Sequence, residues 1–214
     1  ALQEHVSPAG SPASDKRRAL LLGIPFAAVL TTNFDTILDG SVACAGVYNT
    51  VLRGEQSRWW NDRYWSERRA SEHVVKLHGD AGVDDPMNGK IVIARRDYRR
   101  HLYEDGRYAS FMRAMMASKT VLYLGVSFTD AYLNELRSEV LALLGHKRGD
   151  PPIAYAVVND MDPAMCRYFR EHEGIQVLNF NSEATDVPFS GFDDYLRQIH
   201  DATNTAAQLG RSLG

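Results

Sequence analysis

Six short apolar runs along the chain predict buried strands. The runs are rich in β-branched residues and are continuous rather than alternating, a pattern typical of strands that are covered on both faces in a parallel sheet. They cover residues 26–31, 73–77, 91–94, 120–125, 153–158 and 175–180.

Helical patterns lie between several of these runs. Apolar residues recur at spacings of three and four over residues 108–116, 133–144 and 192–199, so each segment carries one apolar stripe. Strands that alternate with helices, joined by connections long enough for a crossover, favour an α/β fold. We therefore expect an open, mostly parallel sheet with helices on both faces.

The length of the chain sets the expected domain organisation. Its 214 residues predict a single domain, at roughly 150 residues per domain. Residues 1–18 are rich in Ser, Pro, Ala and Gly and show no apolar period, which indicates a flexible arm or a truncated start. We assign residues 19–200 to the domain and residues 201–214 to a C-terminal tail or linker.

Charge and apolar run length exclude several functional classes. The 24 basic and 27 acidic residues give a net charge of −3, too close to balance for broad attraction to nucleic acid or anionic lipid. Over residues 51–72 five arginines face four acids, so we interpret this tryptophan-rich segment as a solvated helix rather than a nucleic-acid surface. The longest apolar stretch, residues 19–30, contains Gly23 and Pro25 and is too short to span a membrane.

The two cysteines argue against a structural metal site. Cys44 and Cys166 cannot supply the four close ligands of structural zinc, and neither has another Cys or His within four residues. They also provide no disulfide framework, which is typical of a protein in a reducing compartment. We expect a cytoplasmic protein without zinc or another metal.

Polar clusters follow four of the predicted strands. They are TTNFD at residues 31–35, HGD at 78–80, GVSFTD at 125–130 and ND at 159–160. Open α/β sheets bind ligands at the carboxyl ends of their strands, so we expect the clusters to converge on one crevice. Each cluster alone has a second interpretation, because Thr, Asn and Asp also cap helices; Thr129 and Asp130 are both suited to cap the helix that follows.

Three motifs together resemble a known family. TTNFD, KLHGD (residues 76–80) and LGVSFTD (residues 124–130), in this order and at these separations, are similar to motifs of the sirtuin-like NAD-hydrolase domains of bacterial antiphage defence proteins. The resemblance covers about residues 19–181 and implies a Rossmann-type fold with NAD as its substrate.

The resemblance also implies roles for individual residues. Asn33 and His78 occupy the two positions that carry cleavage of the nicotinamide bond. Asp35 would lie at the nicotinamide end, beside Thr32 of the same motif. The positions that line the phosphates and the adenosine ribose are matched by Gly125, Ser127, Asn159 and Asp160.

The residue types suit this chemistry. Loss of nicotinamide leaves an oxocarbenium-like sugar, which a preorganised polar site stabilises without a strong nucleophile. The amide of Asn33 can orient the attacking water or hold ribose hydroxyls. His78, with an ordinary pKa of about 6.5, can accept a proton from a ribose hydroxyl or from the water.

One departure from the family pattern concerns the phosphate loop. The domain normally opens with a strand that leads into a glycine-rich loop, and the only candidate before TTNFD, residues 8–11, follows no predicted strand. Without that loop part of the pyrophosphate cradle is absent and NAD affinity should suffer. Three explanations stay open: a truncated start, a cradle from elsewhere, or a domain that no longer turns over NAD.

Two alternative functions stay open. One is a catalytically inactive sirtuin-like module that binds NAD, ADP-ribose or a related nucleotide, or that serves in assembly. The other is an NAD-dependent protein deacylase, which is disfavoured because the deacylating sirtuins carry a zinc ribbon with two cysteine pairs. We expect the chain to act with further domains or a partner subunit, as part of a homo-oligomer.

Overall fold

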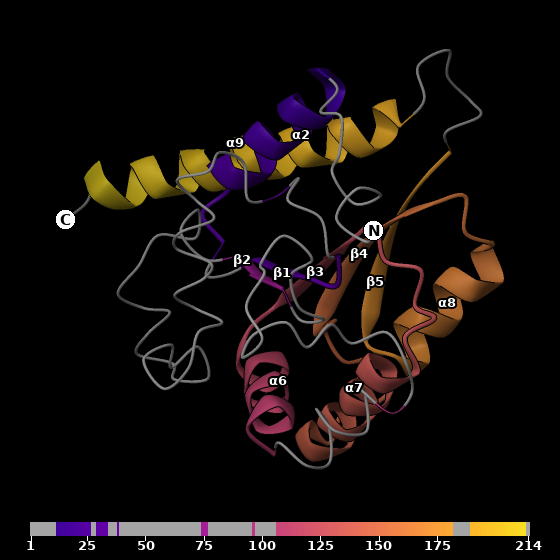
Figure 1. Cartoon of the computed structure of the whole chain (residues 1–214). Coiled ribbons are helices and arrows are strands. Elements are labelled where there is room, and N and C mark those ends of the chain that lie inside the picture. Colours follow the sequence, from indigo (N-terminus) through magenta and orange to yellow (C-terminus); the bar gives the residue numbers. More distant parts are fainter. Residues whose placement is uncertain are drawn as a thin grey trace. The chain divides into compact units, whose positions relative to one another are not determined.

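The computed structural model describes residues 12–26, 29–33, 38, 74–76, 96, 106–181 and 189–212 (Figure 1). The chain divides into two compact units. Unit 1 comprises residues 1–100 together with 196–214, and unit 2 comprises residues 101–195.

Unit 1 contains a parallel strand pair. Strand β1 (Val29–Thr31) pairs with strand β2 (Val74–Lys76), with Val29 opposite Val74 and Thr31 opposite Lys76. The parallel direction places the carboxyl ends of both strands at the same edge of this small sheet.

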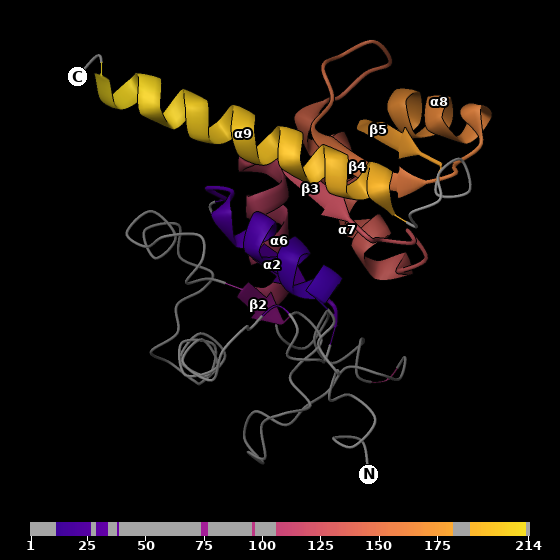
Figure 2. The ribbon, with the colours of Figure 1, turned by 90° about the horizontal axis from the view of Figure 1, so that it is seen from above.

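Two helices pack closely in the same unit. Helix α2 (Pro12–Gly23) meets helix α9 (Ser190–Ser212) at Gly23, where an added Cβ would lie 2.8 Å from Nε2 of His200. The side-chain amide of Asn204 donates to the carbonyl of Gly23 at 3.4 Å. Glycine therefore allows the end of α2 to approach α9, as the ribbon in Figure 2 illustrates.

Two segments are more regular than the sequence indicated. Helix α2 begins at Pro12, inside the segment 1–18 for which no regular structure was expected; proline suits a first helical turn, and Asp15 in that turn interacts favourably with the helix dipole. Helix α9 continues to Ser212 through the segment 201–214, where the hydroxyl groups of Thr203 and Thr205 bond to carbonyls one turn back. The assignment of an arm, a domain and a tail stays a prediction.

Unit 2 contains a parallel sheet of three strands, β3 (Val121–Leu124), β4 (Ala154–Asn159) and β5 (Ile175–Phe180), in the order β3-β4-β5. In the register of the sheet, Leu124 lies opposite Val157 and Asn159 opposite Phe180. The elements follow in the order α6 (Gly106–Ser118), β3 (Val121–Leu124), α7 (Ala131–Leu144), β4 (Ala154–Asn159), α8 (Pro163–His172), β5 (Ile175–Phe180) and the first turn of α9.

Helices cover both faces of this sheet. On one face Ala156 and Ile175, both fully buried, pack with Phe169 of α8 in a single core cluster. Phe180 has the opposite parity from Ile175 along β5 and so faces the other side, where its ring lies 6.2 Å from that of Phe192 at the start of α9. The predicted α/β fold, with a parallel sheet between helices, is confirmed in this unit (Figures 1 and 2).

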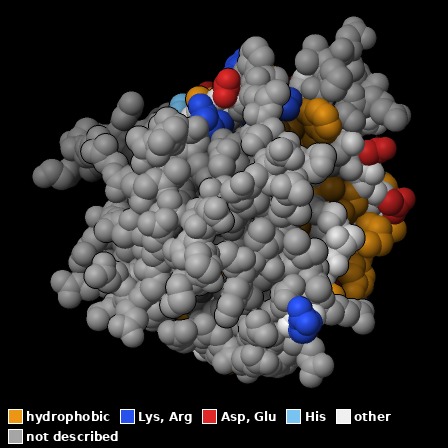
Figure 3. All heavy atoms as spheres, viewed as in Figure 1, with side chains coloured by type: hydrophobic (Ala, Val, Ile, Leu, Met, Phe, Trp, Pro, Cys, Tyr) orange, Lys and Arg blue, Asp and Glu red, His pale blue; other side chains and the backbone are white. Residues whose placement is uncertain are grey.

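The outer side of α8 is partly apolar. Met165 and Tyr168, three residues apart on this helix, are each 46% exposed. Apolar side chains reach the surface on the side of the molecule where α8 lies (Figure 3). Among the described residues, none of the helices has the length and apolar character that a membrane span requires.

Most predicted elements of unit 2 are confirmed. The strand expected at 175–180 coincides with β5. The strands expected at 120–125 and 153–158 and the helices expected at 108–116 and 133–144 occur with at least one end shifted by one or two residues. In unit 1 the strand expected at 26–31 is shorter, because Phe26 lies outside β1, and the strand expected at 73–77 is β2. The strand expected at 91–94 lies outside the described residues.

Helix α8 was not predicted from the sequence, although its first turn carries residues that favour a helix start. Asp162 is its N-cap, and its carboxylate accepts bonds from the backbone N–H groups of Ala164 and Met165. Pro163 follows at the first helical position, where its missing N–H and restricted φ are favourable.

Candidate functional site

The carboxyl edge of the three-stranded sheet brings two of the predicted clusters together. The loop 125–130 follows β3, Asn159 is the last residue of β4, and Asp160 comes directly after it. Because β3 and β4 are parallel and in register, Gly125, Ser127, Asn159 and Asp160 gather at one edge of unit 2. Their part in nucleotide binding stays a prediction.

The loop after β3 needs its glycine for backbone conformation. Gly125 has φ of +63°, in the left-handed region, and an added Cβ would meet no atom within 4 Å. The requirement is therefore conformational and not steric, because L-residues with a Cβ pay a strain cost in this region. Gly125 turns the chain sharply out of the strand.

This loop presents hydroxyl groups to solvent and ends at a helix N-terminus. The side-chain oxygens of Ser127 and Thr129 lie 2.7 Å apart, and both residues are exposed. Asp130 caps α7, since its carboxylate accepts a bond of 3.1 Å from the N–H of Leu133. Of the two residues suited to cap this helix, Thr129 and Asp130, the cap is Asp130, and the positive end of α7 begins directly beyond the loop.

The turn after β4 is held from β5. Asp160 has φ of +50° and its N–H donates to the carbonyl of Phe180 at 2.7 Å. The side-chain amide of Asn179 clamps Met161, accepting from its N–H at 2.9 Å and donating to its carbonyl at 2.8 Å. The backbones of both loops at this edge are therefore held by specific hydrogen bonds, and the two loops present their exposed polar groups at the same edge of the sheet.

In unit 1 the structure describes the end of β1. Thr32 is half-buried and Asn33 is exposed, two residues beyond the end of the strand. The N–H of Asn33 donates to the hydroxyl of the buried Thr31 at 3.1 Å, which ties the backbone of this residue to the strand. His78 and Asp35 lie outside the described residues.

The comparison of sequences identifies the family. The model of the SIR2-like domain matches residues 27–178. The chain belongs to the SIR2-like domain family. This assignment agrees with the parallel α/β architecture of unit 2 and with the sirtuin-like resemblance of the three motifs.

Several curated relatives of this SIR2-like chain carry informative names. It is 30% identical over 124 residues to the NAD(+) hydrolase ThsA of Enterococcus faecium, which covers 56% of the chain and 24% of that protein. It is 27% identical over 125 residues to the protein of the same name from Bacillus cereus (strain MSX-D12), covering 56% of the chain and 24% of that protein. Defense-associated sirtuin 2 of Bacillus subtilis is 23% identical over 191 residues, 88% of the chain and 17% of that protein. The chain thus spans about a quarter or less of the length of these relatives.

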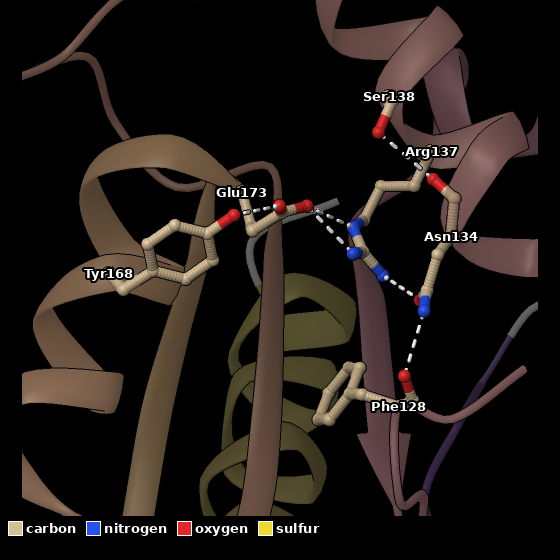
Figure 4. Close-up of polar contacts among 6 residues, drawn as sticks. All are labelled: Phe128, Asn134, Arg137, Ser138, Tyr168 and Glu173. Carbon is tan, nitrogen blue, oxygen red and sulfur yellow. Dashed lines mark hydrogen bonds and ion pairs between the residues drawn. The ribbon is translucent and has the colours of Figure 1, made fainter. Parts of the chain in front are cut away.

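A polar network around the buried Arg137 of this SIR2-like domain was not found from the sequence. Arg137 of α7 bonds to one carboxylate oxygen of Glu173 through Nη2 at 2.7 Å and Nε at 3.2 Å. The other oxygen of Glu173 accepts from the Tyr168 hydroxyl at 3.2 Å, and this bond raises the pKa of that phenol. Nη1 of Arg137 donates to the side-chain oxygen of Asn134 at 3.0 Å (Figure 4).

The sequence contains a local signal for Arg137 but none for its partner Glu173. Arg137 lies four residues after Leu133 and three before Val140, inside the apolar stripe of α7, and a charge there indicates a buried partner. Glu173 is 36 residues away along the chain, just past the end of α8, and no local pattern connects the two.

No candidate metal site is present in the described part of the chain, where no three side chains of the types His, Cys, Asp or Glu form a group.

Proposed function

We propose that the chain is an NAD-consuming hydrolase domain that cleaves the bond between nicotinamide and ribose in a prokaryotic-type defence protein. The observation that carries the proposal is the similarity to proteins named NAD(+) hydrolase, which reaches 30% identity over 124 residues within a SIR2-like domain. The relative named defense-associated sirtuin 2 supports the defence context.

In the proposed reaction a water molecule attacks the anomeric carbon of the ribose. The bond to nicotinamide breaks, its electron pair leaves with nicotinamide, and the water proton passes to His78, so that the products are nicotinamide, ADP-ribose and a proton. Asn33, exposed beyond the end of β1, would orient the water or the ribose hydroxyls. Thr32 and Asp35 would contact the substrate beside it.

The carboxyl edge of unit 2 would bind the other half of the dinucleotide. Its exposed hydroxyls at Ser127 and Thr129, which precede the N-terminus of α7, suit phosphate oxygens and ribose hydroxyls. Gly125 allows the backbone to turn there, and Asn159 and Asp160 add polar groups from β4. The domain would act in the cytoplasm, in a homo-oligomer with further domains or a partner subunit.

The proposal is tested by supplying NAD to the purified protein and measuring nicotinamide and ADP-ribose by liquid chromatography. His78→Ala should lower the rate by about a hundredfold or more, the usual contribution of a catalytic acid or base. Asn33→Ala should lower the rate by about a hundredfold as well, because a misplaced water or ribose costs a factor of that order. His146→Ala is the matched control, because His146 lies in the loop after α7 and should leave the rate unchanged.

Circular dichroism and thermal unfolding establish that the variants are folded. A folded His78→Ala protein with full activity contradicts the assigned mechanism. Binding of ADP-ribose by the unaltered protein, measured by calorimetry, without any release of nicotinamide would instead support a nucleotide-binding module.

A further inference from the structure

Phe128 has a backbone conformation that its side chain disfavours. Its φ is 57°, in the left-handed region, although it is neither glycine nor asparagine. A bulky residue stays in this region only when its surroundings hold it there. Phe128 lies between Ser127 and Thr129, so whatever holds Phe128 also sets the positions of those two exposed residues.

The Phe128 ring is held on several sides. It meets the Tyr123 ring edge to face at a centroid distance of 5.4 Å and the Phe169 ring at 4.8 Å. The guanidinium carbon of Arg137 lies 5.8 Å from the centroid of the same ring, within the range of a cation–π contact. These contacts anchor the side chain in the core of unit 2.

The Phe128 carbonyl is held by a relay of polar side chains. Nδ2 of Asn134 donates to this carbonyl at 2.7 Å, while the Asn134 side-chain oxygen accepts from Arg137 at 3.0 Å. The second bond determines which way the amide points, because only the nitrogen can donate to a carbonyl. Glu173 in turn holds Arg137, and the two side chains are only 16% and 6% exposed (Figure 4).

We propose that Asn134, Arg137 and Glu173 are positioning residues that hold the loop 125–130 in its nucleotide-binding conformation. The inference rests on the proposed function, which places the substrate at this loop. The relay runs from the end of α8 through α7 to the loop, and none of its three members needs to touch the nucleotide.

The relay should affect affinity more than the chemical step. The loop is proposed to contact the phosphates and adenosine ribose of NAD, which do not react. If the loop loses its conformation, the protein therefore binds the substrate and the transition state more weakly by the same amount. Such a change raises KM and the Kd for ADP-ribose, while kcat stays within about twofold.

Asn134→Leu tests the relay directly. The leucine side chain is similar in size and suits a helix, but it cannot donate to the Phe128 carbonyl, and it adds no charge near an anionic ligand. We expect the Kd for ADP-ribose, measured by calorimetry, to rise roughly tenfold, because the variant loses the bond to the Phe128 carbonyl and the bond from Arg137 and leaves both partners unsatisfied. Hydrogen exchange should accelerate at the amides of residues 125–130 and not in β4 and β5.

Ser138→Ala is the matched control. Ser138 is exposed on the same helix and bonds to the backbone carbonyl of Asn134, so its removal perturbs the same turn without touching the relay. Arg137→Lys is a second variant, useful if Asn134→Leu does not fold. It preserves the charge opposite Glu173, but a compact ammonium group cannot also reach Asn134, so ADP-ribose affinity should fall in the same direction.

The outcomes separate the inference from the proposed function. An unchanged Kd in a folded Asn134→Leu protein, or faster exchange throughout unit 2, overturns the positioning role while hydrolysis by the unaltered protein stands. Binding of ADP-ribose without NAD cleavage removes the hydrolase proposal, yet a selective loss of affinity in Asn134→Leu still supports the relay. If the unaltered protein neither binds ADP-ribose nor releases nicotinamide from NAD, both the inference and the hydrolase proposal are overturned.

Discussion

Arg137 places a guanidinium group where its side chain is only 6% exposed, and several contacts offset the cost of its desolvation. Glu173 supplies the opposite charge, Asn134 accepts from Nη1, and the Phe128 ring lies beneath the group. A buried ion pair is weak evidence for added stability, whereas loss of one partner alone costs about 3–5 kcal/mol. We therefore interpret the Arg137–Glu173 pair as selecting one conformation of the loop 125–130 rather than as adding stability.

Tyr123 gives a pH-dependent prediction at the same scale. Burial raises the pKa of its phenol above the ordinary value of 10.0, although the positive charge of Arg137 lowers the pKa in part. Since the folded pKa is the higher one, the stabilising contribution is complete below about pH 10 and is lost as the pH rises from there through the folded pKa.

Urea unfolding of the unaltered protein and of Tyr123→Phe checks this prediction. The difference in unfolding free energy between them should be constant from about pH 7 to pH 9, which serves as the internal control. Above about pH 10 the unaltered protein should lose stability relative to the variant. A difference that stays constant through that range would show that the phenol titrates alike in the folded and unfolded chains.

At the scale of elements, α8 depends on its first turn. The carboxylate of Asp162 accepts from the N–H of Ala164 at 2.7 Å and from that of Met165 at 3.4 Å, groups that have no partner within the helix. The helix carries Phe169 into the core cluster of unit 2. Weakening the cap should therefore weaken the packing of α8 on the sheet.

Replacement of Asp162 by alanine should lower the unfolding free energy by about 1 kcal/mol, measured by urea unfolding. Asp162→Asn is the matched control, because asparagine retains an acceptor oxygen and is an equally good N-cap. Equal losses in both variants would mean that the charge, rather than the cap bond, stabilises the helix.

Element boundaries show where local patterns were sufficient. The strand expected at 175–180 coincides with β5, since an apolar run bounded by Gly174 is a local feature. The sequence placed another strand at 26–31, but β1 spans only Val29–Thr31. Helix α8 was not predicted, because its apolar positions are too few to form a long stripe. Its capping signal, Asp162 followed by Pro163, is nevertheless present in the sequence.

For the whole molecule, a family model shows the family, whereas the proposed function rests on similarity to relatives of known name. The SIR2-like match covers residues 27–178, most of the chain. The similarity to proteins named NAD(+) hydrolase covers 24% of the length of each of the two relatives of that name compared above, so NAD hydrolysis by this chain is a proposal, which the measurement of nicotinamide release tests.

The deacylase alternative makes an opposite prediction about substrates. If the domain hydrolyses NAD, nicotinamide release should proceed at the same rate with and without an acylated lysine peptide, because water is the only acceptor. A deacylase instead requires the peptide for turnover. Chromatography of reactions with acetylated and with non-acetylated peptide distinguishes the two, the latter serving as the matched control.

The sequence alone determined the order and type of most described elements, a cap at Thr129 or Asp130, and the gathering of Gly125, Ser127, Asn159 and Asp160 at one strand edge. These features follow from hydrophobic period, capping and parallel pairing, which act over short stretches of chain. Only the tertiary structure revealed the relay from Glu173 to the Phe128 carbonyl and the left-handed backbone of Phe128. Glu173 and Arg137 are 36 residues apart, and their contact exists only because the folded sheet brings the end of α8 against α7.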